Sequence, residues 1–296
     1  MMDSGIDRID FGLLGTAEFS QRIGRSLSTT GFFVLENAGI DAKLLHQAYA
    51  AGADFFELSE STKLGYCLPE LQGQRGFTPF GKEHAKDSPH PDLKEFWHVG
   101  NPTVQPNLVP IEIVEFGPTL SLLYAQLDRC AQSLLGAIAD FLDEPLGAIY
   151  QPGGDTILRV IHYPPIPENS PSGSLRAAAH EDINLITLLP TASASGLELL
   201  HNGIWEPIDA LPGSVIVDSG DMLQWRTNGQ IKSTTHRVVN PDNGRDRRFS
   251  MPFFVHTHPE SDLTPLPSCV INSYVKFPPI TAGHYLQQRL AEIGLT

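Results

Sequence analysis

Cysteine, long apolar runs and basic residues are all scarce in this sequence. Its 296 residues include only three cysteines, scattered at Cys67, Cys130 and Cys269. This spacing excludes a disulfide framework or a cluster of thiolate ligands, and we expect reduced thiols in a cytoplasmic protein. No run of 18 apolar residues occurs, so no membrane-spanning helix is predicted. The first ten residues are polar and acidic, unlike a secretory signal.

The shortage of basic residues limits the partners that the protein can bind. Twenty Lys and Arg residues stand against 34 Asp and Glu residues, which gives a formal net charge of -14 at pH 7. No block of five or more Lys or Arg residues is present. Nucleic acids and anionic membranes bind to such positive surfaces, so we expect neither of them as a partner.

The remaining composition is typical of a globular protein. Hydrophobic residues make up 41% of the chain and charged residues 18%, which excludes a disordered chain. The length allows one large domain or one domain with a helical annex. We expect a helix-rich region over residues 1–150 that packs on a β core with a C-terminal helix over residues 151–296, the two forming one structural unit.

Hydrophobic periodicity gives the expected elements. In the first region it predicts a buried strand at 31–35, a helix capped by Asp41 and a long helix at 119–143, with a partly ordered excursion at 60–110. In the second region, short apolar runs separated by turn residues predict strands at 156–162, 184–189, 196–200, 214–217, 233–239 and 249–256, then a helix at 282–293. Many short strands of this kind indicate a mainly β fold with flanking helices.

His180 and Asp182 form the most informative local pattern. Residues two apart on a strand share a face, so this pair could chelate one ion while Glu181 points away. His236, in another strand-like run, is the natural third ligand. Two imidazoles and a carboxylate make the facial triad of Fe(II) oxygenases, which leaves metal positions open. The spacing alone is weak, and the competing histidines include His84, His90, His98, His162, His201, His256 and His258.

Arg248 and Ser250 support the choice of His236. They too lie two residues apart on an apparent strand, 12 residues after His236, so both side chains face the same side. A buried guanidinium needs an anionic partner, and a planar carboxylate fits its fork with two hydrogen bonds. An isolated Arg-x-Ser is more often a structural ion pair; in this position it indicates a clamp for a dicarboxylate that chelates the metal.

Taken together, these motifs resemble the isopenicillin N synthase-like family of Fe(II)/2-oxoglutarate-dependent oxygenases. The similarity covers nearly the whole chain. Its segments, in the expected order, are residues 30–40, 158–164, 180–189, 196–199, 220–223, 227–229, 233–238 and 248–250. Several ordered motifs over a hundred residues are far more specific than any one of them.

The resemblance implies a double-stranded β-helix, which is a distorted jelly roll with the metal at its open end. It implies that Fe(II) is held by the catalytic residues His180, Asp182 and His236. The cosubstrate 2-oxoglutarate would bind through its far carboxylate to Arg248 and Ser250, with Tyr163 assisting.

The reaction implied by the resemblance consumes O2, converts 2-oxoglutarate to succinate and CO2, and hydroxylates, desaturates or cyclises a small organic substrate. A monomer with a role in natural product biosynthesis is expected. Two alternatives remain open: an isopenicillin N synthase-type Fe(II) oxidase that uses no 2-oxoglutarate, and a non-enzymatic small-molecule sensor. A cupin-like isomerase would leave the Arg-x-Ser pair unexplained.

The substrate is not identified by the sequence. Candidate contact residues in segments that cover the mouth of the barrel in this family, and at its rim, are Arg75, Phe77, Trp97, His98 and Phe254. Arg75 and His98, or Arg159 and Lys232 from the barrel, could bind a carboxylate or another polar group. An amino acid or peptide, a nucleobase, and a phenolic or terpenoid compound all remain open as substrate classes.

Overall fold

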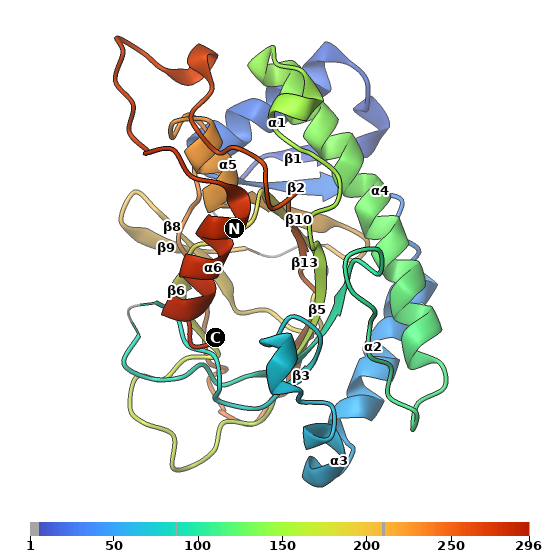
Figure 1. Ribbon diagram of the computed structural model, residues 1–296. Coiled ribbons are helices and arrows are strands. Elements are labelled where there is room, and N and C mark those ends of the chain that lie inside the picture. Colours follow the sequence, from blue (N-terminus) through green and yellow to red (C-terminus); the bar gives the residue numbers. More distant parts are fainter. Residues whose placement is uncertain (1–5, 87, 209–210, 296) are drawn as a thin grey trace.

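Two β-sheets that face each other form the centre of the molecule (Figure 1). The computed structural model describes residues 6–86, 88–208 and 211–295. The larger, nine-stranded sheet has the order β1 (Arg8–Asp10), β2 (Phe32–Glu36), β10 (Val215–Ser219), β7 (Ile186–Pro190), β13 (Phe253–Val255), β5 (Ile157–Tyr163), β4 (Glu95–Gly100) and β3 (Gly76–Thr78), and β12 (Arg248–Ser250) also pairs with β5. The smaller sheet has the order β6 (Ala177–His180), β11 (His236–Val238), β8 (Leu197–His201) and β9 (Ile204–Pro207).

Helices cover the outer face of the larger sheet. The α-helices are α1 (Ala17–Thr29), α2 (Ala42–Phe56), α3 (Glu60–Leu64), α4 (Phe116–Leu142), α5 (Asp221–Arg226) and α6 (Ala282–Glu292), and the short 3-10 helices are η1 (Phe11–Leu13), η2 (Pro69–Leu71), η3 (Leu146–Ala148) and η4 (Pro267–Cys269). The long helix α4 packs against both α1 and α2, and α6 lies on the side of the molecule away from α4 (Figure 1). This arrangement confirms the predicted double-stranded β-helix with flanking helices.

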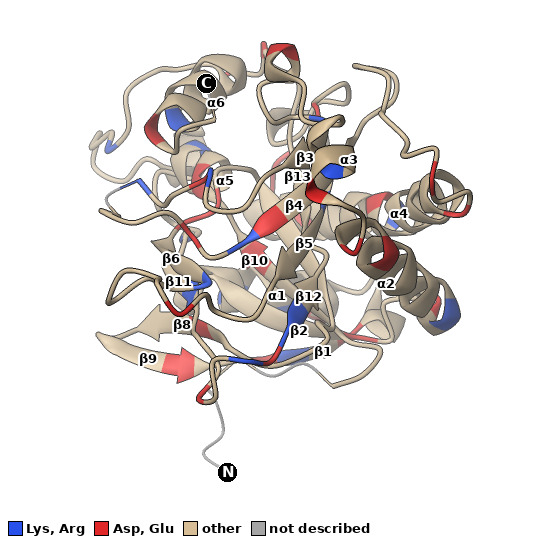
Figure 2. Cartoon of the chain, turned by 90° about the horizontal axis from the view of Figure 1, so that it is seen from below, with Lys and Arg blue, Asp and Glu red and all other residues tan. Residues whose placement is uncertain are grey.

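The apolar residues form two cores, one on each face of the larger sheet. One core joins that sheet to α1, α2 and α4. The other fills the space between the two sheets and includes Phe32, Ile161, Leu199 and Val238. No helix of the described residues is long and apolar enough to cross a membrane. Acidic and basic residues are interspersed over helices and loops in Figure 2, without a uniformly basic element.

Several predicted elements are confirmed near their predicted ends. Asp41 caps α2, since its carboxylate accepts hydrogen bonds from the backbone N–H groups of Lys43 and Leu44. The helices predicted at 119–143 and 282–293 correspond to α4 and α6. The strand predicted at 249–256 is instead divided into β12 and β13 around Pro252, which has no N–H group to donate to a neighbouring strand.

Residues 60–110 are more ordered than the sequence suggests. This segment contains α3, β3 and the fully buried strand β4, which pairs with β5 over six residues from Glu95 to Gly100. The polar composition of the segment gives no sign of β4. Its charged side chains are paired with residues distant in sequence, and its aromatic side chains pack against such residues. Since β1 to β4 join the same sheet as β5, that sheet extends across the boundary predicted near residue 150.

Phe55 joins the helices to the sheet. Its side chain is completely buried, and the centre of its ring lies 4.8 Å from that of Trp97 on β4 and 5.6 Å from that of Phe116 on α4. Removing such a ring leaves a cavity that the surrounding helices and strands cannot fill.

We therefore expect Phe55→Ala to lower the free energy of unfolding by about 3–5 kcal/mol. Urea denaturation followed by circular dichroism measures this loss. Leu122→Ala is a matched control on α4, because Leu122 is 61% exposed and its truncation should change stability little. Equal losses in the two variants would contradict the central position of Phe55.

Candidate active site

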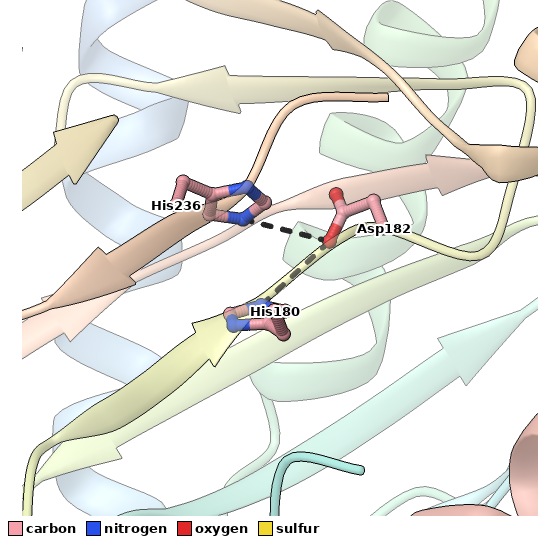
Figure 3. A group of neighbouring side chains, drawn as sticks. All are labelled: His180, Asp182 and His236. Carbon is pink, nitrogen blue, oxygen red and sulfur yellow. Dashed lines mark ion pairs between the residues drawn. The ribbon is translucent and has the colours of Figure 1, made fainter. Parts of the chain in front are cut away.

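His180 and His236 are brought together by strand pairing. In the antiparallel pair β6–β11, His236 lies directly opposite His180, and the centres of the two rings are 4.4 Å apart. Asp182 approaches both: its Oδ1 lies 3.8 Å from Nε2 of His180 and 3.6 Å from Nε2 of His236 (Figure 3). Two ligands about 2.1 Å from one ion lie at most about 4.2 Å apart, so both distances suit a shared metal. These three residues also form the one potential metal-binding group found among the described residues.

The hydrogen bonds of the two histidines leave the correct nitrogens free for a metal. Nδ1 of His180 lies 2.7 Å from the carbonyl oxygen of Ala178, and Nδ1 of His236 lies 3.2 Å from that of Thr234. A carbonyl only accepts, so each Nδ1 carries the proton and each Nε2 presents its lone pair beside Asp182. Burial, followed by the nearby His180, lowers the pKa of His236 to about 4, which keeps it neutral.

Asp182 reaches this position by a different route from the one that the sequence suggests. Strand β6 ends at His180, so Asp182 does not share a strand face with it; that prediction was wrong in its geometry although the two side chains do converge. Instead, the Thr187 hydroxyl donates to Oδ2 of Asp182, and the backbone N–H of Asp221 donates to its carbonyl at 2.7 Å. Gly220 allows the chain to pass here, since a Cβ at this position would collide with the carbonyl oxygen of Asn184.

Asp218 is a second carboxyl group behind Asp182, and it carries no signal in the sequence. The pairing of β10 with β7 places Asp218 opposite Thr187, and both contact Asp182. Burial and the adjacent Asp182 carboxylate raise the pKa of Asp218 well above its usual value. The protonated form is thereby favoured, and it can donate a hydrogen bond that holds Asp182 as the anion.

The Arg248 clamp lies beside the three residues. In the pairing of β12 with β5, Arg248 is opposite Tyr163 and Ser250 is opposite Ile161. A cavity of about 60 Å³ is lined by His180, Asp182 and His236 and also by Arg248, Ser250 and Tyr163. The structure therefore brings together every residue for which the sequence predicts metal or cosubstrate contact.

Polar groups around this cavity lack partners among the described residues. Nη1 of Arg248 is buried without a hydrogen bond, although its Nε donates to the carbonyl of Ala194. Arg176, which the sequence analysis missed, is also buried, and its Nε has no partner. Both guanidinium groups lie near the Tyr163 ring, with their central carbons 5.0 Å (Arg248) and 5.9 Å (Arg176) from its centre. Neither arginine forms a salt bridge with a described residue, so this end of the site suits an added carboxylate.

A larger cavity of about 420 Å³ opens on the same centre. His180 and Asp182 line it, as do His98 and Phe254, two of the predicted substrate residues. Its volume lies within the range of ligand sites in proteins. A small molecule bound in this cavity would contact the metal ligands directly.

The structure places the other three predicted substrate residues away from the large cavity. Arg75 is buried and forms a two-pronged salt bridge with Asp155, at 2.6 and 2.8 Å, so both of its terminal nitrogens are occupied. Phe77 and Trp97 are at most 1% exposed and pack around Phe55 in the core. None of the three lines the large cavity. Their contacts are with other residues of the fold, so a role in substrate binding stays a prediction.

Comparison with known proteins agrees with this geometry. The model of the 2OG-Fe(II) oxygenase superfamily matches residues 154–257, and that of the N-terminal region of non-haem dioxygenases in morphine synthesis matches residues 6–114. A solved 2OG-Fe(II) oxygenase family protein from Caulobacter crescentus is 38% identical, with 97% of this chain and 99% of that chain covered and a TM-score of 0.85. The chain belongs to the 2OG-Fe(II) oxygenase superfamily.

Two further relatives of this 2OG-Fe(II) oxygenase are described by the cofactors that they use. A full-length protein of Neurospora crassa, solved in complex with alpha-KG, which is 2-oxoglutarate, is 30% identical, with 97% and 95% of the two chains covered and a TM-score of 0.85. The 2-oxoglutarate-Fe(II) type oxidoreductase hxnY of Emericella nidulans is 28% identical over 289 residues, covering 90% of this chain and 82% of hxnY. The protein is a non-haem dioxygenase that uses Fe(II), 2-oxoglutarate and O2.

If the three converging residues hold the metal, Asp182→Ala and His236→Ala should each weaken Mn(II) binding by at least about 100-fold. Loss of a residue that only hydrogen-bonds to a metal ligand already lowers metal affinity by about 10- to 100-fold, and loss of a ligand itself should cost at least as much. Mn(II) is a redox-stable substitute for Fe(II), and its binding is measured by electron paramagnetic resonance. His201→Ala is the control, because His201 lies near Glu206 on the neighbouring hairpin, away from both cavities. Unchanged binding by Asp182→Ala would rule out this site.

Proposed function

We propose that this protein hydroxylates, or alternatively desaturates or cyclises, a small organic substrate bound in the large cavity. In this proposal His180, Asp182 and His236 hold Fe(II), and the far carboxylate of 2-oxoglutarate binds Arg248, Ser250 and Tyr163. The observation that carries the proposal is a single site with two neighbouring cavities. His180 and Asp182 line both, whereas His236 and Arg248, whose Nη1 has no hydrogen-bond partner among the described residues, line only the smaller of the two.

Each residue has a defined task in this scheme. The metal and 2-oxoglutarate together supply the activation of O2 while 2-oxoglutarate becomes succinate and CO2. Thr187 and Asp218 hold one side of Asp182, which leaves Oδ1 directed at the two Nε2 atoms. The carbonyl groups of Ala178 and Thr234 fix both imidazole tautomers. Arg248 provides a charge-assisted donor that orients the cosubstrate in the small cavity.

The alternatives from the sequence are less well supported. An oxidase without 2-oxoglutarate would need its own substrate carboxylate at Arg248, whereas the relatives named above are described by their use of 2-oxoglutarate. A sensor would not need a three-residue centre that leaves metal positions open. That the protein is a cytoplasmic monomer without nucleic-acid or membrane partners, acting in natural product biosynthesis, stays a prediction from the sequence.

The large cavity favours a compact polar substrate. Glu83, Asp92, Lys94 and Arg159 line it, and a wholly apolar terpenoid would cover these charges without replacing their contacts with water. The Neurospora protein has been crystallised with alpha-KG and thymine and with alpha-KG and 5-formyluracil. Among the substrate classes left open by the sequence, we therefore favour a small polar molecule of nucleobase or amino-acid size.

We expect the purified protein with Fe(II) and O2 to convert 2-oxoglutarate to succinate slowly by itself, and faster when its substrate is present. Succinate is measured by chromatography against a reaction without Fe(II). Substrate oxidation that proceeds equally well without 2-oxoglutarate would establish the oxidase alternative instead. Binding of candidate substrates with neither succinate formation nor O2 consumption would establish the sensor.

Arg248→Gln should raise the 2-oxoglutarate concentration needed for half-maximal succinate formation by about 10- to 100-fold, because a hydrogen bond to a charged group contributes about 1.5–3 kcal/mol. Arg176→Gln should raise it as well, by a smaller factor, since Arg176 does not line the small cavity. Arg245→Gln, at an exposed position in the same segment, is the matched control. Mn(II) affinity should be unchanged in all three variants. An unchanged cosubstrate requirement in Arg248→Gln would contradict the assignment.

A further inference from the structure

The wall of the large cavity contains a buried cluster of charged groups that the proposed chemistry does not use. Oε1 of Glu83 accepts from Nζ of Lys94 at 2.7 Å and from Nη1 of Arg159 at 2.9 Å. Lys94 also donates to Asp92 at 2.8 Å, and Nε of Arg159 donates to Nε2 of His98 at 2.6 Å. Acidic and basic residues are adjacent at the start of β4 in Figure 2.

The charges that line this cavity are balanced. Among the described lining residues, every Lys and Arg has a carboxylate partner: Lys94 and Arg159 pair with Glu83, and Lys86 and Arg289 pair with Glu292 on α6. His98 adds no charge, because burial and the nearby Arg159 lower its pKa well below the usual value. Around Glu83 the cavity therefore offers no uncompensated cation to a substrate carboxylate, in contrast to the small cavity at Arg248. Farther along the wall, Lys86 and Arg289 share the single carboxylate of Glu292, and Nε of Arg289 has no hydrogen-bond partner among the described residues.

Two atoms of the Glu83–Arg159 pair remain without partners. Oε2 of Glu83 is buried and accepts no hydrogen bond, although the residue is only 6% exposed and lines the cavity. Despite burial, which alone would raise it, Arg159 and Lys94 hold the pKa of Glu83 well below its usual range, so Oε2 belongs to an ionised carboxylate. Nη2 of Arg159 likewise has no hydrogen-bond partner within the described part of the chain.

A buried carboxylate oxygen that accepts no hydrogen bond carries an unfavourable desolvation free energy. An N–H group of a ligand in the cavity would be a suitable donor to Oε2 of Glu83. Nη2 belongs to the same guanidinium whose Nη1 donates to Oε1 of Glu83, and its free N–H requires an acceptor, such as a carbonyl. An amide, lactam or imide edge presents these two groups side by side, as N–H next to C=O. A carboxylate cannot satisfy Glu83, and a hydrocarbon satisfies neither atom.

The aromatic residues around Arg159 suit a flat ligand. The central carbon of its guanidinium lies 4.1 Å from the centre of the Phe96 ring and 5.2 Å from that of Phe254. These contacts limit the rotation of the guanidinium and fix the direction of its free N–H. Phe254 also lines the cavity, where its ring can stack on a planar ligand.

We propose that Glu83 and Arg159 determine substrate specificity, and that they select an uncharged, compact, planar molecule with adjacent N–H and C=O groups, that is, a cyclic amide or imide. This inference rests on the proposed function, because the cavity is taken as the substrate site. It narrows the substrate class by excluding simple carboxylic acids.

The test compares small probes for binding to the protein loaded with Mn(II) and 2-oxoglutarate, which binds ligands without turnover. Thymine and 2-pyridone carry the required edge, whereas N-methyl-2-pyridone lacks the N–H and benzoate carries a carboxylate. Isothermal titration calorimetry measures affinity, and proton relaxation by Mn(II) shows that a bound probe lies near the metal. We expect N-methylation to weaken 2-pyridone binding at least about tenfold, and benzoate to bind at least as weakly.

Variants test the two residues directly. Glu83→Gln should weaken 2-pyridone binding at least about tenfold and strengthen benzoate binding, since Arg159 and Lys94 then lose a compensating charge. Glu198→Gln is the matched control, because Glu198 also pairs with an arginine, Arg237, but lies on β8 and lines neither cavity. It should alter neither affinity.

The inference is overturned if benzoate binds as tightly as 2-pyridone, or if N-methylation has no effect. The probe comparison needs no variant, so it decides the matter even where Glu83→Gln fails to fold. Failure of the proposed function is a separate result: it appears as loss of the Mn(II) and 2-oxoglutarate sites themselves, whatever the probes do.

Discussion

The pairing of two short strands, β6 and β11, is the interaction on which the site depends. Its register places His236 opposite His180, and a shift by one residue would turn one imidazole to the other face of the sheet. Asp182 then has to come from the chain that leaves β6. The larger sheet holds it there, because the pairing of β7 with β10 aligns Thr187 and Asp218 behind it. The centre is thus built from both sheets and requires their correct separation.

The two ends of the site follow opposite electrostatic rules. At the cosubstrate end, the buried residues Arg176 and Arg248 have no carboxylate partner among the described residues, so a bound dicarboxylate completes the structure. At the substrate end, Lys94 and Arg159 are already neutralised by Glu83 and Asp92. This difference separates two small molecules that must bind side by side, since an anion is favoured beside Arg248 and not beside Glu83.

Residues close together in sequence were the ones that sequence reasoning could place. Arg248 and Ser250 carry their geometry in a two-residue spacing on β12, whereas His180 and Asp182 are near neighbours in the chain that do not share a strand. Ordered motifs supplied His236. The ion pair of Arg75 could not be predicted, because its partner, Asp155, lies 80 residues away and no local pattern marks it. The burial of Trp97 could not be predicted for a related reason. An aromatic residue in a polar segment gives the same sequence pattern whether it contacts a ligand or packs in a core.

The residues that were missed depend on long-range contacts. Asp218 acts only through the register of β10 with β7, and Glu83 only through cations on β5 and beside β4. Arg176 follows no motif, and its burial near Tyr163 results from the packing of the two sheets. Spacing along the chain therefore predicts which groups can share a metal, whereas the fold decides which charges surround it.

A crystal structure with Mn(II) and 2-oxoglutarate would test the central claim most directly. The account predicts one metal bound by Nε2 of His180, Nε2 of His236 and Asp182, with 2-oxoglutarate chelating that metal and its far carboxylate on the now unpartnered Nη1 of Arg248. It would be contradicted by a metal held by other groups, or by a 2-oxoglutarate molecule whose far carboxylate lies away from Arg248.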